Sequence, residues 1–195
     1  MSRLVMVRVL ATATVSLASP SVAPIPSACA AALTWALLDH VLGKRTTATG
    51  ILSGALAGIA AIAASAALVG TGGAMLIGVI AAFICRLAHP LVAGRVDDSA
   101  SVFVIHGLSG AIGILLLPVF ALPLMGGVGF DIGITLTSAL ISQAIGLVIV
   151  ALWAMVGSAI AALIVSMLIP IRASAQEEAD GLDLAQHGQQ GWDFR

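Results

Sequence analysis

Long apolar runs separated by short polar stretches form the dominant pattern of this sequence. A helix that crosses a bilayer needs about 20 residues of this kind. The last run has no charged residue before Arg172 and would extend roughly 55 Å as a helix, so it must tilt or project beyond the bilayer. The pattern predicts an all-α polytopic membrane protein with five transmembrane helices, at residues 26–42, 49–70, 73–87, 99–122 and 134–171.

Composition supports this class. Hydrophobic residues make up 60% of the chain and charged residues 9%, with a mean hydropathy of +1.14, whereas soluble domains carry about 25% charged residues. The net charge is −1 and the basic residues are scattered, so no nucleic-acid partner is expected. Cys29 and Cys85 lie in apolar runs and are interpreted as packing residues, with no disulfide framework, metal site or cofactor. Arg86, near the end of the short third run, is expected to extend its side chain to the membrane surface.

Basic residues occur in alternate loops. Because loops rich in Lys and Arg stay in the cytoplasm, this alternation predicts that the C-terminus is cytoplasmic. The expected location is the cell membrane, with several crossings. The basic positions are Lys44, Arg45, Arg95 and Arg172, and the loops without Lys or Arg are 69–73 and 123–133.

Three parts can be distinguished along the chain. Residues 1–23 are similar to a signal peptide, with an incomplete extra crossing as the alternative. Residues 24–171 form the predicted transmembrane domain, and residues 172–195 a cytoplasmic tail. The tail has too little apolar surface to fold alone, so a solvated tail and a docked regulatory segment both fit its composition.

Small residues recur at helical spacing in two of the runs. Within lipid, such ridges let two helices approach closely enough for dispersion forces to hold them together. Helix packing is therefore the first interpretation of these glycines. They are Gly50, Gly54 and Gly58 in the second run and Gly107, Gly110 and Gly113 in the fourth.

His106 lies in the charge-free part of the fourth run. An ionisable group within the membrane is by default a candidate for a substrate pathway. Residues 97–99 are good helix caps, which would place His106 about eight residues into the helix, roughly 12 Å deep. His106, Gly110 and Gly113 would then share one face and line a substrate pathway. The alternative is a structural histidine bonded to a backbone carbonyl. The apolar runs contain no nucleophile–base pair or paired carboxylates, so an enzyme is not expected.

Several motifs resemble the ammonium transporter family (Amt/Mep/Rh). Residues 95–121, with Phe-Val-Ile-His-Gly at 103–107, resemble the family's tenth membrane helix, and residues 126–130 the following extracellular loop. Residues 32–62 are similar to helices seven and eight, and residues 178–188 to the cytoplasmic signature. The resemblance identifies the chain as the C-terminal half of that fold, from helix seven to helix eleven with the tail.

This resemblance implies a function. Family members carry two inverted five-helix repeats around an apolar pore, assemble as trimers, and move ammonium by releasing its proton and passing ammonia. His106 matches the second of two pore histidines, and the first lies in the half not matched here. Ser101 replaces a frequent Asp, and Gly191-Trp192 a frequent Tyr. The tail residues that match the regulatory signature are Gly181, Leu182, Asp183, His187 and Gly188.

The function expected is therefore transport of ammonium or ammonia across a lipid bilayer by a truncated or split transporter, which needs its missing half or an oligomer to conduct. Two alternatives remain open. The chain could be a non-conducting membrane adaptor whose tail binds a PII-type signalling protein, or an inactive fragment.

Overall fold

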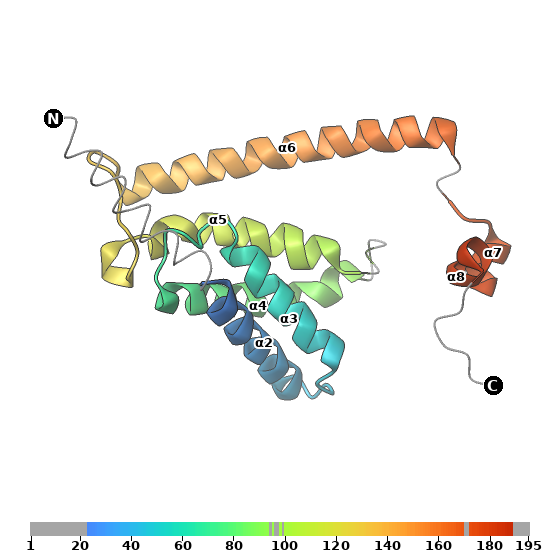
Figure 1. The fold of residues 1–195 in the computed structure, drawn as a ribbon, viewed down its shortest axis with the longest axis horizontal. Helices are drawn as coiled ribbons and strands as arrows, with labels where there is room; N and C mark the ends of the chain where they lie inside the picture. The colour runs from blue at the N-terminus through green and yellow to red at the C-terminus, as the bar shows by residue number, and fades with distance from the viewer. Residues whose placement is uncertain (1–22, 94, 96–97, 99, 170–171, 189–195) are drawn as a thin grey trace. The chain divides into compact units, whose positions relative to one another are not determined.

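The computed structural model describes residues 23–93, 95, 98, 100–169 and 172–188. Within these residues every regular element is a helix (Figure 1), which confirms the all-α prediction. The signal-peptide-like stretch lies almost wholly outside the described residues. The elements are α2 (Pro24–Val41), α3 (Ala48–Ile62), α4 (Thr71–Ala93), the π-helix η1 (Phe103–Leu108), α5 (Ser109–Phe120), the 3₁₀ turn η2 (Pro123–Met125), α6 (Leu136–Leu168), α7 (Ala175–Asp180) and α8 (Leu182–His187).

A helix lies at each of the five predicted spans. Within the described part of the chain, three stretches are long and apolar enough to cross a membrane: Thr71–Val92, Phe103–Phe120 and Leu136–Leu168. The helix Ala48–Ile62 is apolar but shorter. The fold divides into two compact units, Met1–Leu147 and Val148–Arg195. The boundary falls within α6, so the first unit contains the bundle of α2 to α5 with the beginning of α6, and the second contains the rest of α6 with α7 and α8.

The ends of the second and third spans differ from the prediction. The second span ends as a helix at Ile62 rather than at residue 70, because the chain then tightens into turns in which Ser65 and Leu68 donate to carbonyls three residues back. The third span continues to Ala93 rather than stopping at residue 87, through Pro90. The prediction ended this helix too early because polar residues begin there.

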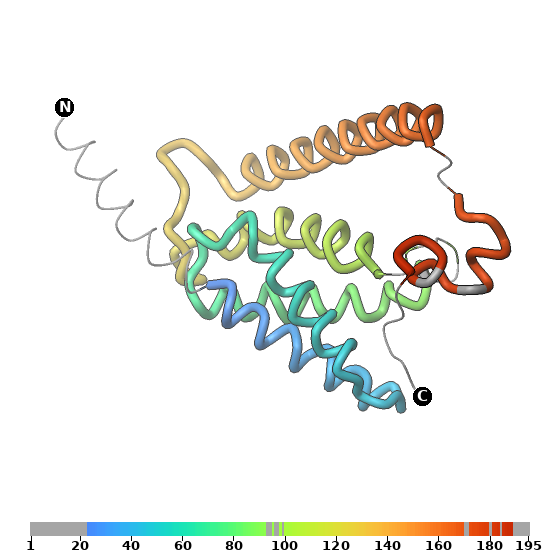
Figure 2. The backbone as a smooth tube through the Cα atoms, turned by 45° about the vertical axis from the view of Figure 1, so that its right-hand side comes forward, coloured from blue at the N-terminus to red at the C-terminus, as the bar shows by residue number. Residues whose placement is uncertain are grey.

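Small residues form the seams between α2, α3 and α4, which lie side by side in Figure 2. A Cβ atom at Gly58 would lie 2.6 Å from the Ala31 Cβ, and one at Gly54 would lie 2.6 Å from the Trp35 Cβ. The buried Ser27 hydroxyl donates to the Gly58 carbonyl at 2.8 Å. Two of the glycines in the predicted ridge therefore act as packing residues, as their spacing predicted.

Candidate functional site

His106 lies in the π-helix η1, which continues directly into α5. This segment begins at Phe103, so His106 is three residues from its start instead of the eight predicted. The reason is a turn before it: Ser101 has a φ of 54° and donates its N–H to the Asp98 carbonyl at 2.9 Å. The Asp98 carboxylate then accepts the N–H groups of Val102 at 2.8 Å and Phe103 at 3.0 Å. Asp98, one of the three predicted caps, is the first residue of this turn and caps the segment with its carboxylate, while residues 97 and 99 lie outside the described part of the chain.

Two side chains bond the carbonyls of the π-turn. The Cys85 thiol of α4 donates to the Val104 carbonyl at 3.3 Å, and the Ser109 hydroxyl donates to the Ile105 carbonyl. Cys85 and Ser109 are both buried. Cys85 thus has a hydrogen-bonding role besides the packing role expected of it. Single π-turns inside helices occur frequently at functional sites, and this one holds His106.

The side of η1 that bears His106 is open. His106 and Gly107 are exposed in this chain, and the His106 ring has no hydrogen bond to any residue that the structure describes. A Cβ at Gly110 would have no neighbour within 4 Å. Gly113 differs, because a Cβ there would overlap the Ala61 carbonyl of α3. The structure therefore leaves space beside His106 and Gly110, and gives Gly113 a role in helix packing.

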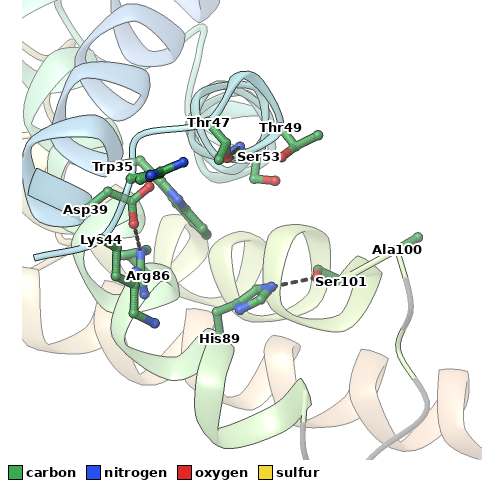
Figure 3. Close-up of a pocket in the computed structure, with 12 residues that line it drawn as sticks. Trp35, Asp39, Lys44, Thr47, Thr49, Ser53, Arg86, His89, Ala100 and Ser101 are labelled. Carbon is green, nitrogen blue, oxygen red and sulfur yellow. Dashed lines mark hydrogen bonds and ion pairs between the residues drawn. The ribbon is translucent and has the colours of Figure 1, made fainter. Parts of the chain in front are cut away.

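A second polar cluster connects α2 and α4, and it was missed from the sequence. Arg86 does not extend to the surface as predicted: it is 5% exposed, and its Nε donates to Asp39 Oδ1 at 2.6 Å (Figure 3). Asp39 is also 5% exposed. The snorkelling prediction is wrong because α4 continues to Ala93, which leaves Arg86 inside the helix and beside α2. The sequence did contain a signal for this ion pair: one charge late in the first run and an opposite charge late in the third. Both runs are predicted to end on the same side of the membrane, so the two charges could meet.

Aromatic and hydroxyl contacts extend this cluster toward His106. The Arg86 guanidinium carbon lies 5.9 Å from the Trp35 ring centroid, within cation–π range. The His89 ring meets the Trp35 ring edge to face, with 6.2 Å between centroids. His89 Nε2 is 2.9 Å from the Ser101 hydroxyl, in the turn that precedes η1. Ser101, which takes the place of a frequent Asp in the family resemblance, thus joins α4 to the segment holding His106.

The tail residues singled out from the sequence lie together. Gly181, with a φ of 92°, separates α7 from α8, and Gly188, with a φ of 64°, follows α8. Such φ values favour glycine. The other predicted members, Leu182, Asp183 and His187, lie on α8 and are exposed.

Helix α7 begins with a capping box. The Glu177 carboxylate accepts the Ser174 N–H at 2.7 Å and the Ser174 hydroxyl at 2.8 Å. The backbone bond, followed by the hydroxyl bond, holds the pKa of Glu177 below its ordinary value. The box therefore stabilises α7 at neutral pH and is lost as the pH falls through that lowered pKa.

Comparisons with known proteins agree with this geometry. The sequence model of the Ammonium Transporter Family matches residues 10–192. The ammonium transporter Amt1 of Archaeoglobus fulgidus is 35% identical over 163 residues, which cover 83% of this chain and 41% of that protein. An ammonium transporter of Mycobacterium tuberculosis is 34% identical over 173 residues, which cover 85% of this chain and 36% of that protein.

Solved structures show the same fold. The Sensor Amt Protein superposes with a TM-score of 0.77 at 24% identity, covering 88% of this chain and 42% of its own. The N240A mutant of Candida albicans Mep2 gives 0.68 at 29% identity, covering 86% and 39%. The chain spans about two fifths of the length of the relatives it matches. With a family match over nearly its whole length, the chain belongs to the ammonium transporter family.

Proposed function

We propose that this chain forms the part of an ammonium transporter that contributes His106 to the conduction pathway, and that it conducts only when a partner half covers the His106 face. The observation that carries the proposal is the open space beside His106 and Gly110 on a helix of a transporter-family protein. The proposed pathway includes His106 and Gly110, and it includes Gly113 only through the close packing of α5 on α3.

The proposed chemistry follows from desolvation. Ammonium loses its hydration shell on entering an apolar passage, and this favours the neutral amine. A neutral imidazole can donate from one ring nitrogen and accept at the other. His106 can therefore hydrogen-bond ammonia where no water remains. Gly107 and Gly110 add no side chain that would fill the space next to the ring.

The need for a partner rests on the cost of an exposed imidazole. Within a bilayer, the open His106 face would meet lipid, where an unpaired polar group is costly. Two copies of this chain could build an inverted repeat only by inserting in opposite directions. The one-sided placement of Lys44, Arg45 and Arg95 disfavours that arrangement. The other half of the family fold, placed over the His106 face within an oligomer, meets the requirement.

Uptake measurements test this proposal. Cells expressing the chain alone are expected to take up labelled methylammonium no faster than cells with an empty vector. Co-expression with a chain that supplies the other half of a family transporter is expected to give saturable uptake. Saturable uptake by the chain alone would contradict the need for a partner. Absence of uptake from the co-expressed pair, with retention of a PII-type protein by the tail, would favour the adaptor instead.

The proposed location is the cell membrane, with the tail in the cytoplasm. In a Cys29→Ser background, Leu124→Cys is expected to react with an impermeant thiol reagent added to intact cells, because Leu124 is 90% exposed in a loop without Lys or Arg. Ala185→Cys on α8 is expected to react only after the cells are permeabilised. Labelling of position 185 in intact cells would overturn the orientation.

A further inference from the structure

A cavity of about 460 Å³ opens where α2 ends and α3 begins, beside α4 (Figure 3). Its lining is mostly basic or hydroxyl-bearing, and Asp39 is the one carboxylate among the described residues that line it. Neither the transport pathway nor the tail accounts for it. The polar residues that line it are Trp35, Asp39, Lys44, Arg45, Thr47, Thr49, Ser53, Arg86, His89 and Ser101.

The central group of this cavity is the Arg86 guanidinium. A guanidinium has five N–H donors, and the bond to Asp39 uses only the one on Nε. No further hydrogen bond of Arg86 is formed with the residues that the structure describes. Arg86 is 5% exposed and lines the cavity. Among the described residues no buried side-chain nitrogen lacks a partner, so the other N–H groups of Arg86 are open to the cavity, where a bound group can accept them in place of solvent.

Asp39 cannot fill that role. Its second oxygen, Oδ2, lies on the Gly50 side, 3.1 Å from the position of a Cβ at Gly50. That side is occupied by the start of α3, where the Thr47 hydroxyl accepts the Gly50 N–H at 3.1 Å. The carboxylate is thus held between Arg86 and α3, and it offsets only one of the nearby positive charges.

Two more cations border the same cavity. Lys44 and Arg45, from the turn between α2 and α3, line it and are exposed. Among the described residues of the lining, they and Arg86 give three basic side chains against the single carboxylate of Asp39. His89 adds a ring whose Nε2 already faces the Ser101 hydroxyl. A cavity with surplus positive charge and unused N–H donors binds anions, and arginine favours oxyanions with several acceptor oxygens.

We propose that this cavity binds a phosphate group, with Arg86 as the buried anchor and Lys44 and Arg45 as the outer cations. A phosphate supplies several oxygen acceptors for the N–H groups of Arg86 that face the cavity, and a charge that balances the surplus. The group can belong to an anionic lipid headgroup or to a soluble phosphate compound. The loops at this end of the helices are basic, and basic segments beside a membrane attract the anionic headgroups of the cytoplasmic leaflet. The proposal does not depend on ammonium conduction.

The test uses the full chain in nanodiscs made only of phosphatidylcholine. In one arm, inorganic phosphate is titrated and its binding is followed by ³¹P line broadening. In the other, phosphatidylglycerol is added to the discs and native mass spectrometry counts the lipids retained. Binding in the first arm identifies a soluble phosphate site, and retention in the second identifies a headgroup site.

Two variants of matched chemistry locate the binding. The double substitution Lys44→Gln/Arg45→Gln changes exposed residues and is expected to weaken binding at least about tenfold, the effect of losing roughly 1.4 kcal/mol of charge-assisted bonding. Arg95→Gln removes an exposed charge of the same kind outside the cavity lining and is expected to change binding little. The proposal would be overturned if neither arm showed binding, or if Arg95→Gln weakened binding as much as the double substitution. It would also be overturned if a peptide of residues 172–195 occupied the cavity and phosphate did not displace it.

Discussion

Replacing Arg86 with leucine is expected to lower the free energy of unfolding of this chain by about 3–5 kcal/mol, because the change leaves a buried carboxylate without its counter-ion. The Asp39 side chain is buried, and the 2.6 Å bond from Arg86 Nε is its link to α4. Arg86 also lies against Trp35, so packing is lost together with the charge. Unfolding of the purified chain in mixed detergent micelles, followed by circular dichroism, measures the change.

Two further variants separate the ion pair from general effects of substitution. Arg95→Leu removes an exposed arginine at the same end of α4 and is expected to cost less than about 0.5 kcal/mol. The double variant Asp39→Leu/Arg86→Leu removes both charges, and it is expected to regain most of the lost stability, since apolar replacements of buried pairs are often neutral. A single Arg86→Leu variant as stable as Arg95→Leu would show that the pair contributes nothing to the fold.

The helical fold follows from features that the sequence displays locally. Apolar runs of sufficient length predicted a helix at every span, and the four-residue spacing of glycine predicted the close contacts of Gly54 and Gly58 with α2. These predictions succeed because the length of a span and the spacing of small residues are set by the bilayer and the helix repeat. Neither requires knowledge of which helices are neighbours.

The Asp39–Arg86 pair could not be predicted in the same way. An arginine at the edge of an apolar run is compatible both with snorkelling and with a buried partner, and only the neighbouring helix decides between them. Here α2 supplies that partner from far along the sequence. The contacts of Trp35 and His89 depend on the same packing between helices. For this reason the sequence alone did not predict that these residues form a site.

The sequence drew attention to His106, but it did not predict the backbone geometry around this residue. Periodicity assumes an uninterrupted α-helix, whereas the chain turns at Ser101 and then forms the π-helix η1. These two departures shorten the distance from the helix start and change which residues share a face. Gly110 therefore remains beside the open space, while Gly113 packs on Ala61. Side-chain bonds from Cys85 and Ser109, which hold the π-turn, have no signature in a hydropathy pattern.

In an assembly complete enough to transport, His106→Leu is expected to reduce methylammonium uptake about tenfold or more, the effect of removing roughly 1.4 kcal/mol of hydrogen bonding at the limiting step. The fold should be retained, because the His106 ring is exposed in this chain and bonds to none of the described residues. Leucine fills similar space but neither donates nor accepts a hydrogen bond. Uptake per molecule of membrane-inserted protein is the measurement.

His40→Leu is the matched control, since it makes the same chemical change at an exposed histidine in the last turn of α2. It is expected to leave uptake unchanged. Gly110→Leu supplies a second, steric test: a Cβ at this position has no neighbour within 4 Å, so the leucine should enter the open space and block the pathway. Normal uptake by His106→Leu together with normal uptake by Gly110→Leu would place the pathway elsewhere. Loss with both, and not with His40→Leu, would require that ammonia pass along this face, because the His106 ring bonds to none of the described residues and a Cβ at Gly110 has no neighbour within 4 Å.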